Sequence, residues 1–198
     1  KAGLSGRDII WDQNYRHNLS IRKTLEVIAN NYKGDRSAAD FKALVTYTKR
    51  VMFANGIHHH YSMDKFKPGF SKDFFTEVTA SLNLQIEEEV LKAIFDPNFD
   101  NKKVNLDVDK GLVKGSAVNF YDPDITEAEV DAYYKALSKD GDKEKPLSYG
   151  LNSKVVRGKD GKLTEAVYSA QGMYKEAIVE IIGWLEKAVT VAENEAQA

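Results

Sequence analysis

The chain has 198 residues, of which 42% are hydrophobic and 29% are charged, a composition typical of a globular protein with a core of ordinary size. Its formal net charge is −2, so the sequence predicts neither a nucleic-acid partner nor an anionic membrane as partner. The absence of cysteine excludes disulfide bonds and cysteine-ligated zinc, and no apolar run reaches the roughly 18 residues of a membrane-spanning helix.

The amino-terminal part of the sequence predicts two amphipathic helices. Apolar side chains recur at helical spacing over residues 20–32 and again over residues 41–52. Ser37 and Asp40 fit a capping box at the start of the second helix. Asn55-Gly56 predicts its end, because both residue types tolerate the left-handed backbone of a C-terminal cap.

Shorter helices are expected to continue to about residue 100. Ser71 is placed to cap a short helix that reaches Val78. A further helix is expected over residues 86–95, and Asp96-Pro97 ends it because the residue before a proline is disfavoured in a helix. We therefore interpret residues 1–100 as a helical part.

Residues 101–170 differ from this pattern and predict a mixed α/β part. Val104, Leu106 and Val108 alternate with polar residues, which is typical of an edge strand or an extended arm. Four further elements are expected: a short strand at residues 118–120, a helix from a Thr126/Glu129 capping box to Leu137, a charged loop at residues 139–146, and a β-hairpin at residues 151–170 that turns at Lys159-Asp160-Gly161.

Residues 171–196 predict the longest helix, which carries a broad apolar stripe. The stripe comprises Ala177, Ile178, Ile181, Ile182, Leu185, Ala188, Val189 and Ala192. Because so wide a stripe needs cover, we expect an exposed apolar patch and self-association through it. The chain begins with lysine, and we expect that it is cut from a longer protein. The whole of residues 1–198 is thus interpreted as one piece with a predominantly helical α+β fold, a β-hairpin and short strands.

Three of the four histidines are consecutive in the stretch "NGIHHHY", just past the second predicted helix. In an extended loop His58 and His60 would point one way and His59 the other, and a third zinc ligand would have to come from Asp64 or His17. No histidine is followed by glutamate, so the H-E-x-x-H zinc helix is absent. We therefore expect a surface loop without a native metal, to which nickel or zinc binds only adventitiously.

The sequence also lacks the usual motifs of other catalytic sites. It contains no cysteine nucleophile and no G-x-S-x-G elbow. The glycine pairs in "KGLVKGSAV" and "GKDGK" lack the spacing of a phosphate-binding loop and predict turns instead. From the residues alone, the sequence predicts an α+β chain without a complete active site.

Five segments, taken in order and spread over nearly the whole chain, resemble the dipeptidyl-peptidase III family, most closely its branch in Bacteroides-type bacteria. They are "WDQNYRHNLSIRKTLEVI", "YTKRVMFANGIHHHYSMDKFKPGF", "KGSAVNFYDPDITEAEVDAYY", "YGLNSKVV" and "MYKEAIVEIIGWLEKAVTVAENEAQA". Members of this family are zinc exopeptidases that remove dipeptides from the amino terminus of short peptides. The resemblance implies an enzyme of two lobes, in which the zinc lobe is mostly helical and the other lobe mixes helices with a β-barrel-like core.

The resemblance places this chain in the amino-terminal portion of the non-zinc lobe. The family's zinc ligands lie in H-E-x-x-G-H and E-E-x-R-A-D/E, and neither pattern occurs here. The resemblance therefore implies no catalytic or metal-binding residue in this chain, no peptidase activity of the chain alone, and zinc only in the parent enzyme. The implied partners are a peptide substrate and the remainder of the same polypeptide, including the zinc lobe.

In relatives, the loop that matches "NGIHHHYSMDKF" borders the substrate cleft, and the match implies His60 and Tyr61 as the residues that contact the peptide. A different class of function remains open, namely a self-standing helical binding module whose His/Tyr loop recognises a protein or a metal. The compartment is also open: the cytoplasm is favoured, and the periplasm fits if a signal peptide has been removed.

Overall fold

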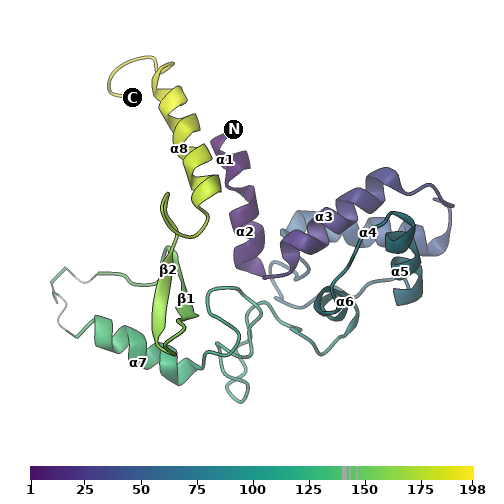
Figure 1. Cartoon of the computed structure of the whole chain (residues 1–198), viewed down its shortest axis with the longest axis horizontal. Coiled ribbons are helices and arrows are strands. Elements are labelled where there is room, and N and C mark those ends of the chain that lie inside the picture. Colours follow the sequence, from purple (N-terminus) through teal and green to yellow (C-terminus); the bar gives the residue numbers. More distant parts are fainter. Residues whose placement is uncertain (140–141, 143, 146) are drawn as a thin grey trace. The chain divides into compact units, whose positions relative to one another are not determined.

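The structure, a computed structural model, describes residues 1–139, 142, 144–145 and 147–198, and four residues of the expected charged loop at 139–146 lie outside the described part. The fold is α+β and predominantly helical, with one antiparallel β-hairpin (Figure 1). The chain forms two compact units, which we call the core unit, Trp11–Val118, and the hairpin unit, Lys1–Ile10 with Asn119–Ala198.

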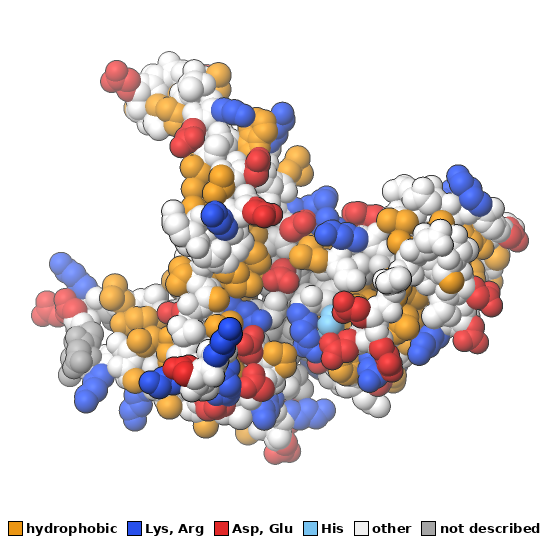
Figure 2. Space-filling view, viewed as in Figure 1, with side chains coloured by type: hydrophobic (Ala, Val, Ile, Leu, Met, Phe, Trp, Pro, Cys, Tyr) orange, Lys and Arg blue, Asp and Glu red, His pale blue; other side chains and the backbone are white. Residues whose placement is uncertain are grey.

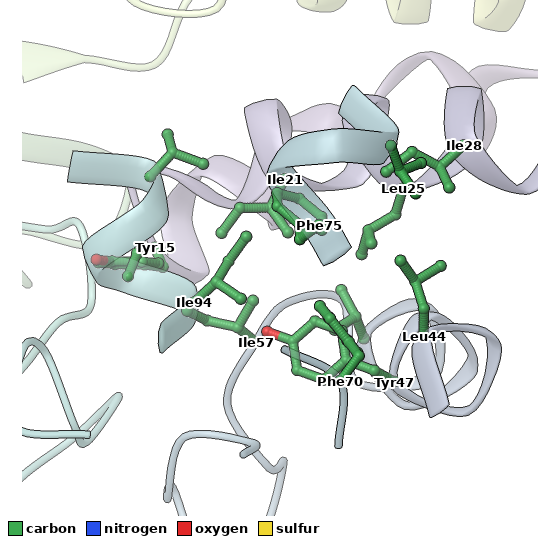
Figure 3. Close-up of a cluster of buried hydrophobic side chains, with 14 of the residues drawn as sticks. Tyr15, Ile21, Leu25, Ile28, Leu44, Tyr47, Ile57, Phe70, Phe75 and Ile94 are labelled. Atoms are coloured by element: carbon green, nitrogen blue, oxygen red, sulfur yellow. The ribbon is translucent and has the colours of Figure 1, made fainter. Parts of the chain in front are cut away.

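The core unit is built from helices connected by loops. Helix α2 (Arg7–Asn14) contains the boundary between the units, and the helices that follow are α3 (Asn18–Asn31), α4 (Ala39–Ala54), α5 (Lys72–Ser81) and α6 (Glu88–Phe95). The apolar positions predicted from helical spacing point inward. Figure 3 shows the resulting cluster, whose fully buried members include Tyr15, Ile21, Leu25, Ile28, Leu44, Ile57, Phe75 and Ile94. This packed cluster is the frame that carries the loop after α4.

Local capping explains most of the helix boundaries in the core unit. Ser71 caps α5 as predicted, since its hydroxyl accepts the amide hydrogen of Phe74. Asn55 adopts the left-handed conformation with φ of 54° and ends α4, which confirms the predicted stop. The predicted capping box at the start of α4 is wrong. The hydroxyl of Ser37 instead donates to Asp35 at 2.6 Å, and Asp40 accepts from Ser71 at 3.1 Å.

Residues 104–108, expected as an edge strand or extended arm, form no strand: residues 105–107 have no regular secondary structure, and a turn begins at Val108. The side-chain oxygen of Asn105 accepts the backbone N–H of Asp107 at 3.0 Å, which bends the chain at the point where a strand would continue. Leu106 and Val108 consequently lie in solvent, 82% and 93% exposed. Alternation of polar and apolar residues predicts a strand only where a neighbouring strand is available to pair with it.

The hairpin unit contains α1 (Ala2–Ser5), α7 (Glu127–Leu137), β1 (Ser153–Arg157), β2 (Leu163–Val167) and α8 (Lys175–Val189). The predicted hairpin is confirmed, with Ser153 opposite Val167 in an antiparallel register and Gly161 at a φ of 78° in the turn. The predicted capping box of α7 is confirmed in both of its hydrogen bonds. The short strand expected at residues 118–120 is reduced to one bridge between Tyr121 and Val155.

Helix α8 is shorter than the helix expected over residues 171–196. Before it, the backbone of Met173 bonds to Val167, which extends the hairpin and keeps this segment out of the helix. After it, the hydroxyl of Thr190 donates to the carbonyl of Lys187, a side-chain bond that competes with helical pairing. No residue of α8 is fully buried.

One side of α8 packs against α1, and the other side is uncovered. Gly6 faces Ile181, and the amino group of Lys1 lies 4.3 Å from the centre of the Trp184 ring. Figure 2 shows hydrophobic side chains exposed along the helix. The exposed apolar residues of α8 include Val179, Ile182, Leu185 and Val189. The predicted exposed patch is therefore confirmed for α8, and self-association through it stays a prediction. Within the described residues, no helix is both long and apolar enough to cross a bilayer.

Candidate functional site

The loop after α4, residues 57–66, folds back on itself, and we call it the histidine loop. The backbone N–H of Phe66 donates to Ile57 at 2.8 Å, and that of His59 donates to Asp64 at 2.8 Å. The first bond pairs the two arms of the loop at its base, and the second pairs them nearer its tip. Together the two bonds close a short hairpin-like turn. The loop is therefore an ordered projection from the core unit.

A second segment of the chain fixes the loop from one side. The backbone N–H of Lys65 donates to Asn101 at 3.0 Å, and that of Lys103 donates to Met63 at 2.8 Å. The side chains of Lys102 and Asp64 form an ion pair at 2.8 Å, which lowers the pKa of the Asp64 carboxyl group. The ion pair is exposed and contributes little by itself, so the backbone bonds hold the loop in place.

His58 faces inward and is 2% exposed. Its Nε2 atom lies 2.8 Å from the carbonyl oxygen of Asp100, so this nitrogen carries the proton and donates it. Its Nδ1 atom is covered and has no hydrogen-bond partner among the described residues, which fits a neutral ring. Burial lowers the pKa of His58 to about 4, against a smaller opposing effect of the hydrogen bond to Asp100. At neutral pH His58 is an uncharged structural residue.

Asp100 connects His58 to a partly buried polar cluster that precedes α3. The hydroxyl of Tyr15 donates to the Asp100 carboxylate at 2.7 Å, and Arg16 pairs with the same carboxylate oxygen at 3.2 Å. The edge-to-face ring contacts of Tyr15 with His17 and His58 have centroid distances of 5.2 and 5.3 Å. Burial lowers the pKa of His17, and the nearby charge of Arg16 lowers it further. This cluster holds the base of the histidine loop against the core.

The outer half of the histidine loop, residues 59–62, presents aromatic rings to solvent. The Nδ1 atom of His59 accepts the backbone N–H groups of Tyr61 and Ser62, both at 3.2 Å, and so shapes the tip. The His59 and His60 rings stack with centroids 4.7 Å apart, and the Tyr61 ring lies 4.3 Å from that of His60. Tyr61 is 82% exposed. Backbone hydrogen bonds thus hold an accessible aromatic surface in one conformation.

The residues that flank the tip line two different hollows. His60 lines one of about 550 Å³, together with Arg50 and Phe53 from the last turns of α4. Tyr61 lines another hollow of about 480 Å³, together with Leu106 and other residues of the segment 101–110. The outer half of the loop therefore forms a ridge with a hollow on each side. A bound peptide could lie across such a ridge.

The structure corrects the expected geometry of the histidine run in two respects. His58 is buried and does not belong to a surface loop, because its ring fills the space beside Tyr15. His59 and His60 do not point in opposite directions, because the tip is a tight turn and their rings stack. His60 is half-buried and Tyr61 is exposed, and their expected role in peptide contact stays a prediction.

Sequence reasoning did not assign a role to Arg50 or Phe53. Phe53 is 77% exposed, and its ring lies 5.3 Å from that of His60 in an edge-to-face contact. The available signal was the spacing: the two residues are three apart at the end of an amphipathic helix, so they are neighbours on its surface, outside the buried positions. A large exposed aromatic side chain on the polar face of such a helix indicates a binding surface.

The described residues do not fit a catalytic zinc ion. In residues 1–139, 142, 144–145 and 147–198, no three His, Asp or Glu side chains gather closely enough to hold a metal ion. His58 in addition uses Nε2 for the carbonyl of Asp100, so the run cannot direct three imidazoles at one point. No chemical step through a metal is derived from this chain.

Neither a scan against models of protein families nor a search of curated proteins finds a match to this chain.

Proposed function

We propose that this chain is the amino-terminal part of the non-zinc lobe of a dipeptidyl-peptidase III-like zinc exopeptidase. In this proposal it supplies scaffold and part of the wall of the cleft in which a short peptide is held, and the remainder of the same polypeptide supplies the zinc. The proposal draws on the five segments of the sequence that resemble the family in order. It assigns peptide contact to the outer half of the histidine loop, through Tyr61 and His60.

The observation that carries the proposal is the contrast between order and exposure in the histidine loop. Tyr61 is 82% exposed, although its backbone is bonded to His59 and the loop is paired with residues 101–103. Exposed aromatic rings on an ordered backbone lose little conformational entropy when they bind, so they suit recognition of a peptide. The Tyr61 ring offers an apolar face and a hydroxyl, and the His60 ring offers an apolar face and its Nε2 atom, since its Nδ1 atom is covered.

The proposal assigns binding and no chemistry to this chain. Activation of a water molecule in this family requires the zinc ligands of H-E-x-x-G-H and E-E-x-R-A-D/E, which are absent from residues 1–198. We therefore expect the purified chain to release no product from a dipeptidyl-naphthylamide, with or without added zinc. Zinc-dependent turnover well above the blank would contradict this assignment.

The binding role is tested by isothermal titration calorimetry of the full chain with the tetrapeptide Ala-Ala-Ala-Phe. Loss of one packed aromatic contact costs about 1–2 kcal/mol, so Tyr61→Ala should weaken binding roughly five- to thirtyfold. Leu151→Ala is the matched control, because Leu151 is 74% exposed and belongs to the hairpin unit. Equal affinity of the Tyr61→Ala variant and the unaltered chain would remove the loop from the peptide site.

The relation to a zinc enzyme is tested separately from binding. Sequencing of the gene downstream of the codon for Ala198 should reveal a segment that encodes H-E-x-x-G-H within the following few hundred codons. A stop codon soon after Ala198 would instead favour the self-standing binding module, in which the same loop recognises its ligand without a catalytic partner.

A further inference from the structure

The hollow between α4 and the histidine loop has one apolar wall. Phe53 projects from the end of α4, and its ring meets His60 edge to face with centroids 5.3 Å apart. His59 stacks on His60 and meets Phe66 edge to face at 5.9 Å, so these rings form a continuous surface. The volume of about 550 Å³ lies in the range of small-ligand sites. This wall can accept an apolar side chain.

The remaining lining of the same hollow carries a surplus of positive charge. Its charged residues are Arg50, Asp64, Lys65 and Lys67, of which only Asp64 is acidic. The Asp64 carboxylate is already paired with Lys102 at 2.8 Å, outside this lining. The hollow thus has three cationic side chains and one carboxylate that is neutralised from elsewhere.

Two of the three cations are available to a ligand. The amino group of Lys65 donates to the backbone carbonyls of Asp96 and Phe99, so it is engaged. Arg50 and Lys67 are exposed, and across the part of the chain that the structure describes neither has a carboxylate within ion-pair distance. Arginine binds carboxylates through two parallel hydrogen bonds, which lysine cannot reproduce. Arg50 is therefore the main candidate for an anion, with Lys67 in support.

We propose that this hollow binds a peptide carboxylate that lies next to an apolar side chain. Phe53 and His60 contact the apolar side chain, and Arg50 with Lys67 contacts the carboxylate. The inference rests on the proposed function and specifies its substrate class: peptides that present an anionic group at the position of the hollow. The carboxylate can be the carboxyl terminus of a short peptide or the side chain of an acidic residue.

Three peptides, titrated calorimetrically into the full chain, distinguish these sources. They are Ala-Ala-Ala-Phe with a free carboxyl terminus, the same peptide as its amide, and Ala-Ala-Glu-Phe as its amide. The free acid should bind about tenfold more tightly than its amide, the size of one good charge-assisted contact. If the glutamate peptide recovers this affinity, the hollow accepts any carboxylate there. If it does not, the hollow reads the carboxyl terminus.

Variants assign the effect to the hollow. Arg50→Gln should reduce the tenfold preference for the free acid to about twofold, because it removes the charge and the paired hydrogen bonds. Phe53→Ala should weaken both the acid and the amide by about tenfold and leave their ratio unchanged. Lys49→Gln is the matched control, since it removes one exposed cation from the same turn of α4 without altering the lining.

The possible results separate this inference from the function on which it rests. Equal binding of acid and amide, together with weaker binding by Tyr61→Ala, would overturn the inference and leave the proposed function in place. A preference for the acid that survives Arg50→Gln would also overturn it. If no peptide binds to the unaltered chain, both the inference and the proposed function are wrong.

Discussion

His58 and Tyr61 lie three residues apart in one loop, yet they have opposite surroundings. His58 is 2% exposed and is bonded to Asp100, whereas Tyr61 is 82% exposed and its ring lies beside the ring of His60. The difference teaches that a run of similar side chains can divide its roles within a few residues. At the inner end of the histidine loop, His58 fixes the loop against the core, and at the outer end Tyr61 is accessible.

The same comparison extends to the three adjacent histidines, whose side chains are held in different ways. Each ring has a separate contact: His58 bonds to a buried carbonyl, His59 accepts two backbone N–H groups of the tip, and His60 packs against Phe53. Among the described residues, no three His, Asp or Glu side chains gather as a ligand set, and the expected absence of a native metal stays a prediction.

The largest expected effect is on stability and separates the two halves of the loop. His58→Ala should lower the free energy of unfolding by about 3 kcal/mol, because it leaves a cavity beside Tyr15 and an unpaired carbonyl at Asp100. His60→Ala, at a half-buried position near the tip, should cost less than about 1 kcal/mol.

Urea unfolding in a Trp184→Phe background measures this difference. Trp11 is then the remaining tryptophan, and it is buried in the core unit, so its fluorescence reports on that unit without a signal from the hairpin unit. If both histidine variants lost the same stability, the division of the loop into an inner and an outer half would be wrong.

The next prediction concerns pH and sharpens the role of His58. Its pKa is about 4 in the folded protein, below the ordinary value of 6.5, so the unfolded chain takes up this proton first as the pH falls. Stability from His58 is therefore fully present above about pH 6.5 and is lost towards pH 4, by about 3 kcal/mol in total. His17, whose pKa is also lowered, acts in the same direction.

The pH effect is measured by urea unfolding at intervals from pH 7.5 to pH 4. A His58→Gln variant, which has no titrating group at this position, should show a clearly shallower decline that retains only the contribution of His17. Carboxyl groups with lowered pKa values, such as Asp64, contribute only at the acid end of this range and below it. An unchanged decline in the His58→Gln variant would show that another group is responsible.

The smallest expected effect tests how the outer half of the loop is shaped. His59→Ala removes the acceptor for the backbone N–H groups of Tyr61 and Ser62 and should cost about 0.5–1 kcal/mol, because the tip is exposed and water replaces the bonds. Hydrogen exchange at these two amides should become faster, while the amides of α3 keep their protection. Unchanged exchange at Tyr61 and Ser62 would mean that His59 does not hold the tip.

Local signals in the sequence predicted much of the fold. The cap at Ser71, the left-handed stop at Asn55 and the hairpin turn at Gly161 each depend on a few neighbouring residues, and all three are confirmed. The cap at Ser37 failed because Asp35, two residues away, offers its hydroxyl a competing acceptor. The strand expected at residues 104–108 failed because Asn105 forms a turn there.

The candidate site was less accessible to sequence reasoning, because its character depends on distant residues. The burial of His58 requires Asp100, which is 42 residues away, and Tyr15, which is 43 residues away. The hollow beside His60 arises only when α4 and the histidine loop are placed together. By contrast, the exposure of Tyr61 follows from its position at the tip of a loop, and its expected contact with a peptide stays a prediction.

The central claim is that the outer half of the histidine loop binds peptide while the inner half supports it. Amide chemical shifts of the ¹⁵N-labelled full chain, recorded during titration with Ala-Ala-Ala-Phe, test it most directly. The account predicts that the largest changes occur at residues 59–62 and at Phe53, with small changes at His58 and in the buried cluster. Saturable changes confined to the hairpin unit, or no saturable change at any amide, would contradict it.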